Sequence, residues 1–399
     1  MISRLILCGL MSSLIFFFTV VVKNFSPTSI IYAAFLIFIY SRMTFSERKK
    51  MGSSVICRRI FQTVFAIGFC IAFISDLYAE RGSMAITSQA MNNSELPFCH
   101  IAIPQVLVPF LITKSIIFPA RVSGMYAAIS SMICIWLAVT LTVGRGWCSW
   151  ICFYGGWEEG FSHVAKKRRL NLIPKNKEMR EIHFGFFFFI ILASLCQFAC
   201  VYCEWFCPFK LTTEFFPMNS IPSLLAGVMF IGLFLALVVV LPILTKRRVQ
   251  CSTLCPFGAF ASLTDRFSLF RIKIDGEKCT GCLKCANTCP FGAIDILTIQ
   301  DKKRHPEITC AKCGECINAC LQKAIRYEFR FNSNKKKCGC GQRKIPRTKL
   351  GQTIQELLEP SELFRFAAFS FAVIMSSGFV DRSLAIIFKA FAKALAGAF

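Results

Sequence analysis

The sequence has little charge, and negative charge is the scarcer kind. Only 17% of its 399 residues are Asp, Glu, Lys or Arg, against about 25% in an ordinary soluble protein. The 46 Lys and Arg outnumber the 22 Asp and Glu, and apolar residues make up 55% of the chain. This composition excludes a disordered or acidic solvating chain and is typical of a membrane protein.

Motifs for the common organic cofactors are also absent. The sequence has no C-x-x-C-H for covalent haem, no Gly-rich phosphate loop and no Rossmann fingerprint. These motifs supply covalent attachment or backbone donors that haem, ATP and nicotinamide cofactors need. We therefore expect no site for any of the three.

Long apolar runs predict helices that cross a membrane, which takes about 20 residues each. The runs cover residues 3–22, 59–79, 124–143, 183–202 and 221–244, with a shorter one at 29–40. Residues 101–119 contain three prolines and a lysine, so we expect a re-entrant segment there, because lipid cannot replace lost backbone donors. Residues 1–250 are thus predicted to form a polytopic membrane domain of about six helices.

Lys and Arg gather in three of the connections between these runs, at residues 41–59, 144–182 and 246–248. Positive loops stay in the cytoplasm, so we expect a multi-pass protein of the cell (inner) membrane with these loops inside. Membrane topology accounts for most of the positive charge, and we therefore expect a lipid bilayer but no nucleic acid as a partner.

The rest of the chain is predicted to contain four parts. These are a linker with a C-x3-C-P motif at 251–270, a cysteine-dense domain at 271–330, a basic linker at 331–360 and C-terminal apolar and amphipathic helices at 361–399. The apolar run at 363–380 is either another crossing or an interfacial helix, and the sequence leaves both open.

Eight cysteines form two runs with one shared spacing, C-x2-C-x2-C-x3-C. This is the spacing of bacterial ferredoxins, in which the fourth cysteine of each run ligates the other run's [4Fe–4S] cluster. The rule assigns Cys279, Cys282, Cys285 and Cys320 to one cluster, and Cys310, Cys313, Cys316 and Cys289 to the other. Zinc sites instead pair two C-x2-C elements across a longer spacer. We therefore predict two [4Fe–4S] clusters in a ferredoxin-like (α+β) domain, inserted in an α-helical polytopic membrane protein.

Three further cysteine pairs share the spacing C-x3-C. They are Cys148 and Cys152, Cys203 and Cys207, and Cys251 and Cys255. A four-residue step places both sulfur atoms on one helical face, so each pair could hold a metal or a further iron–sulfur cluster. The alternative is that these cysteines are small apolar residues filling gaps between helices.

The predicted topology separates these pairs. The first and third lie at the cytoplasmic boundary beneath the ferredoxin domain, and Cys203 and Cys207 lie at the outer boundary. Cys99 and His100 could complete an outer metal site with them. A disulfide of Cys203 or Cys99 is the competing interpretation if the outer compartment is oxidising, and the sequence leaves both open.

Residues 144–152 (GRGWCSWIC) and 251–259 (CSTLCPFGA), followed by the double cysteine run, resemble the membrane polyferredoxins of the NapH and NosR type. The resemblance covers about residues 60–330. It implies a module that passes electrons between the quinol pool or cytoplasmic donors and partner redox proteins. Phe153 stands where the family has proline after the first pair, and Cys203 and Cys207 form an additional pair.

The expected function is membrane-bound iron–sulfur electron transfer, rather than a self-contained enzyme. Lysines of the ferredoxin domain predict a soluble acidic redox partner at the cytoplasmic face; they are Lys278, Lys284, Lys302, Lys303, Lys312 and Lys323. Quinone and an outer-face redox protein are further candidate partners. The alternative functions are assembly of a metal centre such as copper in a membrane oxidoreductase, and quinol oxidation.

Overall fold

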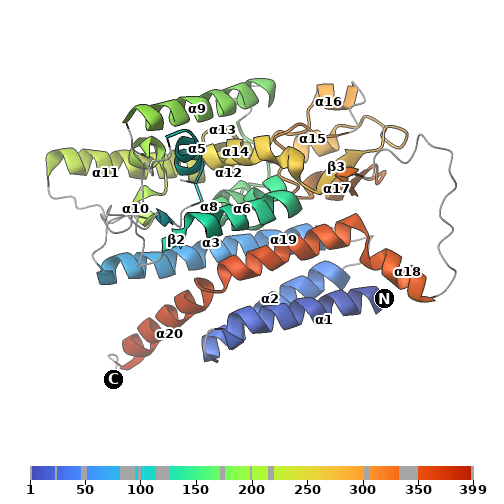
Figure 1. Ribbon diagram of the computed structural model, residues 1–399, viewed down its shortest axis with the longest axis horizontal. Coiled ribbons are helices and arrows are strands. Elements are labelled where there is room, and N and C mark those ends of the chain that lie inside the picture. The colour runs from blue at the N-terminus through green and yellow to red at the C-terminus, as the bar shows by residue number, and fades with distance from the viewer. Residues whose placement is uncertain are drawn as a thin grey trace.

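The computed structural model is mostly helical (Figure 1). It describes residues 2–22, 25–45, 52–80, 95–97, 100–101, 103–113, 126–170, 176–197, 200–213, 220–300, 305–331 and 349–396. Cys99, Cys338, Cys340, Lys302 and Lys303 lie outside the described residues.

Five helical stretches are long and apolar enough to cross a membrane. They are α1 (Ile2–Phe16) with η1 (Phe17–Val21), α2 (Pro27–Phe45), residues Ser54–Ile74 of α3 (Gly52–Glu80), residues Arg180–Gln197 of α9 (Asn176–Gln197), and Ile221–Thr245. The last stretch joins α11 (Ile221–Leu233), η5 (Phe234–Val240) and α12 (Leu241–Thr245). These stretches coincide with four of the five long predicted runs and extend the short one.

Residues 124–143 differ from the prediction. They contain the three-residue strand β2 (Tyr126–Ala128), which pairs with β1 (Glu95–Pro97), and then α6 (Ile129–Thr142). The 14 residues of α6 fall short of the about 20 that a crossing takes. The proline-rich segment forms α5 (Ile103–Thr113), also short, with Pro109 inside it.

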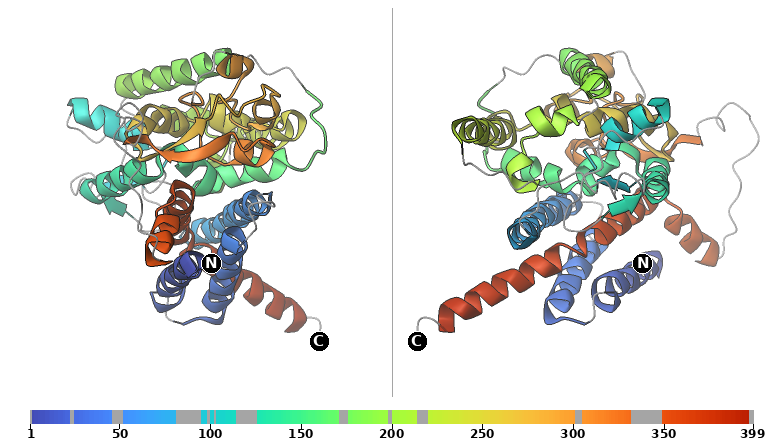
Figure 2. Two further views of the ribbon diagram at one scale, coloured as in Figure 1. Left: turned by 90° about the vertical axis from the view of Figure 1, so that its right-hand side faces the viewer. Right: turned by 60° about the vertical axis from the view of Figure 1, so that its left-hand side comes forward.

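The C-terminal residues form three helices, α18 (Lys349–Leu357), α19 (Pro360–Ser376) and α20 (Val380–Ala396). The last two bend by 44° at their junction and together are long enough for one broken span. In two views, α1, α2 and the α19–α20 pair lie on one side of α3, and α9 and α11 lie on the other (Figures 1 and 2).

The cysteine-dense region lies at one end of the molecule (Figure 1). Its antiparallel strands β3 (Phe270–Ile274) and β4 (Ile325–Phe329) are paired with Ile272 opposite Tyr327. Between them lie three one-turn helices, α15 (Lys284–Thr288), α16 (Ile296–Gln300) and α17 (Glu315–Ala319). The region thus has one two-stranded sheet among the described residues, and the full ferredoxin-like (α+β) fold stays a prediction.

Short helices connect the membrane helices to this region. They are η3 (Gly144–Gly146), α7 (Trp147–Trp150), α8 (Phe153–Ser162), η4 (Tyr202–Phe206), α10 (Lys210–Thr213), α13 (Val249–Thr253), α14 (Pro256–Thr264) and η6 (Asp265–Phe267). Helix α8 packs closely on α3, where the rings of Phe69 and Phe153 stack with centroids 3.6 Å apart. A Cβ at Gly156 would lie 2.2 Å from the backbone oxygen of Gln62, so this approach requires glycine.

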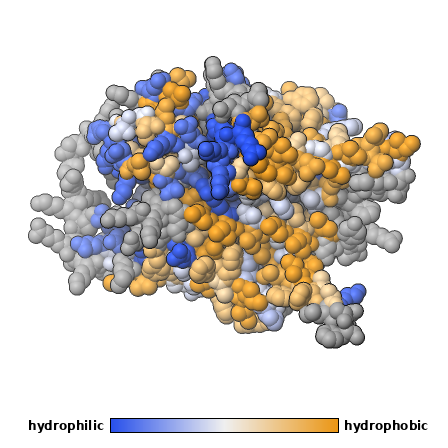
Figure 3. Space-filling model, turned by 180° about the vertical axis from the view of Figure 1, so that it is seen from behind, coloured by the Kyte–Doolittle hydropathy of each residue, from blue (hydrophilic) through white to orange (hydrophobic). Residues whose placement is uncertain are grey.

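Apolar side chains are exposed along the candidate membrane helices. Leu10 of α1, Phe38 of α2, Leu192 of α9 and Leu225 of α11 are each more than half exposed. Hydrophobic residues gather over one part of the surface and hydrophilic residues over another (Figure 3). A surface of this extent is expected where helices face lipid.

Candidate iron–sulfur sites

The first predicted set of four cysteines lines one cavity with about 390 Å³ of empty space. Cys279, Cys282, Cys285 and Cys320 share it with apolar side chains from β3 and β4. Gly281 has a φ of 71°, the left-handed conformation that glycine adopts readily. Cys282 is exposed, so this site reaches the protein surface.

The second predicted set lines a more deeply buried cavity, with about 310 Å³ of empty space. Its cysteines are Cys289, Cys310, Cys313 and Cys316. Burial raises the pKa of Cys310 to about 12, so its thiol would ionise at neutral pH only with a bound metal. The structure therefore brings together both sets that the spacing predicts, and four thiols around each cavity fit a [4Fe–4S] cluster.

The second cavity rests directly on the loops that carry two of the C-x3-C pairs. The Ser149 hydroxyl donates to the Ala311 carbonyl (2.5 Å), and the Trp150 indole N–H donates to the Lys312 carbonyl (3.3 Å). The backbone N–H of Arg248 donates to the Pro290 carbonyl (3.0 Å). These bonds hold the cysteine-dense region against the helical domain.

Cys148, Cys152, Cys251 and Cys255 come together in the core, and all four are buried. Burial and repulsion from the thiolates of Cys148 and Cys255 raise the pKa of Cys152 well above its usual range. Cys148 and Cys251 pack in one cluster with Cys289 of the second cavity. The first and third pairs thus form one four-thiol site adjacent to the second predicted cluster.

The spacing predicts that the two cysteines of each pair lie on one face of a single helix. The structure instead places them in successive helices. Cys148 is in α7 and Cys251 in α13, whereas Cys152 and Cys255 are the N-caps of α8 and α14. Their sulfur atoms accept backbone N–H groups of Gly155 (3.3 Å) and Gly258 (3.4 Å). Each pair therefore spans a break between two helices, with its second cysteine at the start of the next helix.

A repeated pentapeptide could have revealed this arrangement from sequence. Residues 255–259 and 289–293 both read CPFGA, and Cys289 also accepts a backbone N–H, from Ala293 at 3.3 Å. The C-x3-C-P pairs thus match the second half of the ferredoxin run.

Arg145 and Arg248 are completely buried beside this site, although their loops were predicted to be cytoplasmic surface. Their guanidinium carbons lie 5.6 and 4.9 Å from the ring centroid of Phe291. Three guanidinium nitrogens of each have no hydrogen-bond partner among the described residues, and Arg248 has an ion pair to Glu159 (3.5 Å). Buried charge without full compensation is costly, so an anion is needed here.

Acidic residues of α8 complete the surroundings of the four-thiol site. The Glu158 carboxylate accepts the backbone N–H groups of Gln250 (2.7 Å) and Cys251 (3.0 Å), which orients α13. Burial would raise the pKa of Glu159, but Arg58 and Arg248 lower it to about 2. Sequence reasoning missed both glutamates, because no cysteine spacing points to them.

His100 lies beside Cys152, with its Nε2 3.2 Å from that sulfur atom. It was predicted to join Cys203 and Cys207, and the structure places it at the four-thiol site instead. Burial lowers the pKa of His100 to about 3, so the imidazole is neutral. Its Nδ1 has no hydrogen-bond partner among the described residues.

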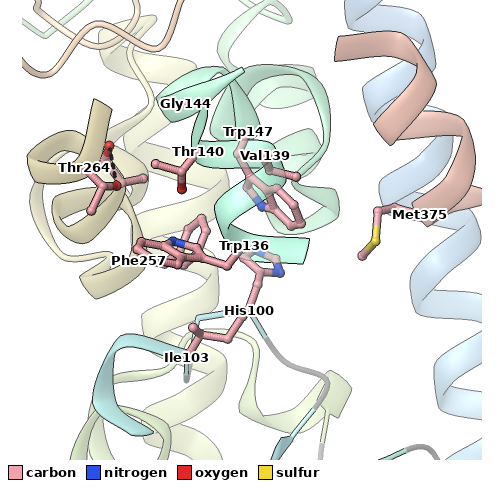
Figure 4. A pocket seen from close by; sticks show the side chains of 11 residues that line it. His100, Ile103, Trp136, Val139, Thr140, Gly144, Trp147, Phe257, Thr264 and Met375 are labelled. Carbon is pink, nitrogen blue, oxygen red and sulfur yellow. Dashed lines mark hydrogen bonds between the residues drawn. The ribbon is translucent and has the colours of Figure 1, made fainter. Parts of the chain in front are cut away.

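A small apolar pocket opens next to His100. Figure 4 shows Trp136, Trp147 and Phe257 around it, with Met375 of α19 on the far side. The neutral imidazole is thus one of few polar groups in a pocket of aromatic rings.

The second C-x3-C pair begins in η4 and is linked to this region through Tyr202. Its backbone N–H donates to Gln105 Oε1 (3.1 Å), which also accepts the Ser194 hydroxyl near the end of α9. The Tyr202 hydroxyl accepts a hydrogen bond from Gln250, the residue before Cys251. One tyrosine therefore spans the distance between the second pair and the four-thiol site.

One predicted surface lysine is buried. The Lys312 ammonium pairs with Asp265 (2.8 Å) and donates to the Ser268 hydroxyl (2.7 Å), because its loop packs on η3. Lys278, Lys284 and Lys323 are exposed, as expected.

Comparisons with known protein families match the cysteine motifs. A 4Fe-4S dicluster domain matches residues 271–321, and a 4Fe-4S binding domain matches residues 125–171, 183–217 and 227–275. Each of these last three ranges contains one of the three predicted C-x3-C pairs, and residues 183–217 also contain Cys196 and Cys200 at the same spacing. No solved structure matches the chain.

Several curated proteins are similar to parts of the chain. The ferredoxin-type protein NapH of Haemophilus influenzae is 26% identical over 194 residues, which cover 46% of this chain and 62% of NapH. The putative electron transport protein YccM of Escherichia coli is 22% identical over 210 residues, 50% of this chain and 55% of YccM. An uncharacterized protein of Methanocaldococcus jannaschii is 28% identical over 173 residues, 34% of this chain and 67% of that protein.

The chain thus matches less than two thirds of the length of NapH and YccM. The 4Fe-4S domains, the electron-transport relatives and the apolar helices nevertheless agree. The chain contains 4Fe-4S binding domains and candidate membrane helices, and it is similar to ferredoxin-type and electron-transport proteins, as its cysteine motifs predict.

Proposed function

We propose that this chain carries electrons between a soluble cytoplasmic partner and the membrane, through three thiolate-ligated iron–sulfur sites. The observation that carries this proposal is the packing of Cys148 and Cys251 against Cys289 and Cys313. It makes the four-thiol site a continuation of the two ferredoxin sites. The three sites would then form one series, with the exposed Cys282 in its first site and the buried Cys152 in its last.

The chain's own residues prepare the four-thiol site, called the inner site below, for an anionic group. The site contains four buried cysteines, and Arg145 and Arg248 supply two buried positive charges. A cluster with four thiolate ligands carries net negative charge and would compensate them. Clusters bound at the three sites would supply one-electron transfer.

Exposed charge favours a cytoplasmic orientation and an acidic partner. Lys284 lines the outermost cysteine cavity, and Lys278 and Lys323 are exposed close to its cysteines in sequence. A partner carrying carboxylates would associate there by electrostatic attraction. The positive loops of the helical domain support the same orientation.

Iron analysis tests the number of sites. Anaerobically purified protein should contain about twelve iron atoms if three cubanes are bound, and about eight if only the ferredoxin sites are. Replacing both Cys148 and Cys251 with serine should remove about four iron atoms and one EPR component of the reduced protein. Cys134→Ser, at an exposed position of α6, is the control and should change neither. Eight iron atoms in the unmodified protein would reject the inner cluster.

Quinol oxidation is a second candidate function, favoured by the pocket in Figure 4. The pocket is lined by aromatic side chains, and Nδ1 of His100, which has no hydrogen-bond partner among the described residues, would accept a hydrogen bond from a quinol hydroxyl group. Quinol should then reduce the iron–sulfur sites of the purified protein, and His100→Phe should slow this reduction while leaving the iron content unchanged.

Metal delivery is the remaining alternative, and it depends on Cys203 and Cys207. Copper(I) bound by the purified protein and lost in Cys203→Ser and Cys207→Ser would support it. Unchanged copper binding in both variants would exclude these residues as the metal site.

A further inference from the structure

Cys200 and Cys203 hold their sulfur atoms 2.9 Å apart. A disulfide bond joins two sulfur atoms at about 2.0 Å, so a movement of about 1 Å would allow one to form. Two residues separate the cysteines, the spacing of many redox-active dithiols. Cys200 follows Cys196 at the C-x3-C spacing, but it belongs to neither ferredoxin run and to none of the three pairs at Cys148 and Cys152, Cys203 and Cys207, and Cys251 and Cys255.

The two thiols differ in accessibility. Cys200 is completely buried, Cys203 is partly exposed, and the next two residues, Glu204 and Trp205, are exposed. Thiol–disulfide exchange requires one accessible attacking thiol and a second thiol that resolves the mixed disulfide. Cys203 is positioned for the first role and Cys200 for the second.

The pair is also connected to the four-thiol site. Tyr202 lies between the two cysteines in sequence, and its hydroxyl accepts the hydrogen bond from Gln250, the neighbour of Cys251. Its backbone N–H bond to Gln105 holds the tyrosine in place. Packed and hydrogen-bonded side chains thus extend from the four-thiol site to the pair.

We propose that Cys200 and Cys203 form a redox-active dithiol–disulfide couple that reduces an accessible disulfide. This inference rests on the proposed function, because the iron–sulfur sites are the reductant. The couple takes up two electrons, which these sites deliver one at a time.

The Cys203 thiolate attacks the substrate disulfide, forms a mixed disulfide and releases one substrate thiolate. The Cys200 thiolate then attacks the Cys203 sulfur, which releases the second substrate thiolate and forms the Cys200–Cys203 disulfide. The two protons of the cysteine thiols pass to the substrate thiolates. Two electrons from the iron–sulfur sites and two protons from solvent restore the dithiol.

Electron counting tests the couple in the full-length protein. In an anaerobic reductive titration, the oxidised protein should take up two more electrons per molecule than Cys200→Ser. Serine at this position removes the couple but leaves every cysteine of the three predicted C-x3-C pairs. Cys196→Ser, at an exposed cysteine one helical turn earlier, is the matched control and should take up as many electrons as the unmodified protein.

Alkylation provides an independent measurement. The tryptic peptide of residues 181–210 contains four cysteines, at positions 196, 200, 203 and 207. Denatured under acid and alkylated, this peptide should carry four alkyl groups after reduction and two after oxidation with diamide. In Cys200→Ser it should carry three in both states.

Two results would overturn the inference. One is equal electron uptake by the unmodified protein and Cys200→Ser, both with full iron content. The other is a metal that stays bound after oxidation and is lost in Cys200→Ser, since the thiols would then be metal ligands. A protein without iron would reject the proposed function instead, and the alkylation count would still show whether the couple exists.

Discussion

Arg145 and Arg248 show how single residues prepare this protein for its cofactors. A guanidinium group is nearly always charged, and complete burial of two such groups requires compensating negative charge. The thiols of Cys148 and Cys251 lie in the same cluster as Phe291, on which both arginines stack. Electrostatics at these two positions should therefore set how readily the inner site is reduced.

Replacing Arg248 with glutamine should lower the reduction potential of the inner site. Reduction adds negative charge, which the guanidinium stabilises, and a shift on the order of 60 mV corresponds to a tenfold change for a one-electron couple. An EPR-monitored redox titration measures the shift. Arg266→Gln, at an exposed position of η6, should leave the potential unchanged, and equal potentials in all three proteins would contradict this electrostatic role.

Gly155 is required because Arg248 lies against its backbone. A Cβ there would be 1.9 Å from Nη2 of Arg248, so Gly155→Ala should lower the free energy of unfolding by about 1–3 kcal/mol through overpacking. The midpoint of thermal unfolding in detergent measures this loss. Gly232→Ala is the control, because nothing lies within 4 Å of the added Cβ; a similar midpoint for both variants would argue against the contact.

Helices α3, α8 and α17 are joined by one buried network of ion pairs. Arg58 of α3 pairs with Glu159 of α8 (2.6 Å) and with Glu315 of α17 (3.0 Å). Arg58 also donates to the carbonyl of Ser149 (2.8 Å), beside Cys148. Removing one member leaves the others buried without full compensation, so the junction of the helical and cysteine-dense parts depends on this arginine.

Arg58→Gln should destabilise the protein by about 3–5 kcal/mol, the cost of breaking a buried ion pair. It should also loosen the contact between the second ferredoxin site and the four-thiol site. Thermal unfolding and the rate of electron equilibration between sites measure the two effects. Arg59→Gln is the comparison, because this side chain is 26% exposed and also pairs with Glu315. Equal losses in both variants would show that burial of Arg58 is not the cause.

Across the whole molecule, polar and apolar surfaces are separated. Exposed lysines occur near the outermost cysteine cavity, and exposed apolar side chains cover the candidate membrane helices. This arrangement suits a protein that meets lipid along its helices and a soluble partner at its cysteine-dense end (Figure 3).

Electron exchange with an acidic ferredoxin-type partner should slow as salt is added, because salt screens the attraction between surface charges. Replacing Lys278, Lys284 and Lys323 with glutamine should weaken the salt dependence of the association rate in stopped-flow measurements. Replacement of Lys389 and Lys393, on α20 away from the cysteine-dense region, is the control. A rate independent of salt would reject an electrostatic docking surface.

Local spacing was sufficient to predict which cysteines share a cavity and where most of the candidate membrane helices lie. A cysteine run specifies its ligand set because two- and three-residue steps fix where the sulfur atoms can reach. Apolar length likewise limits which segments can cross a bilayer. Residues 124–143 were assigned wrongly as a full crossing, because composition alone does not reveal that a strand pair shortens the helix.

Contacts between segments that are distant in sequence decided the features that local spacing did not predict. Cys148 and Cys152 are about a hundred residues from Cys251 and Cys255, and packing of α14 against η3 and of α13 against α8 brings them together. The burial of Arg145 and Lys312 and the position of His100 arise in the same way. Spacing along the chain constrains neighbours within a turn or two, whereas charge compensation and close packing depend on which segments fold against each other.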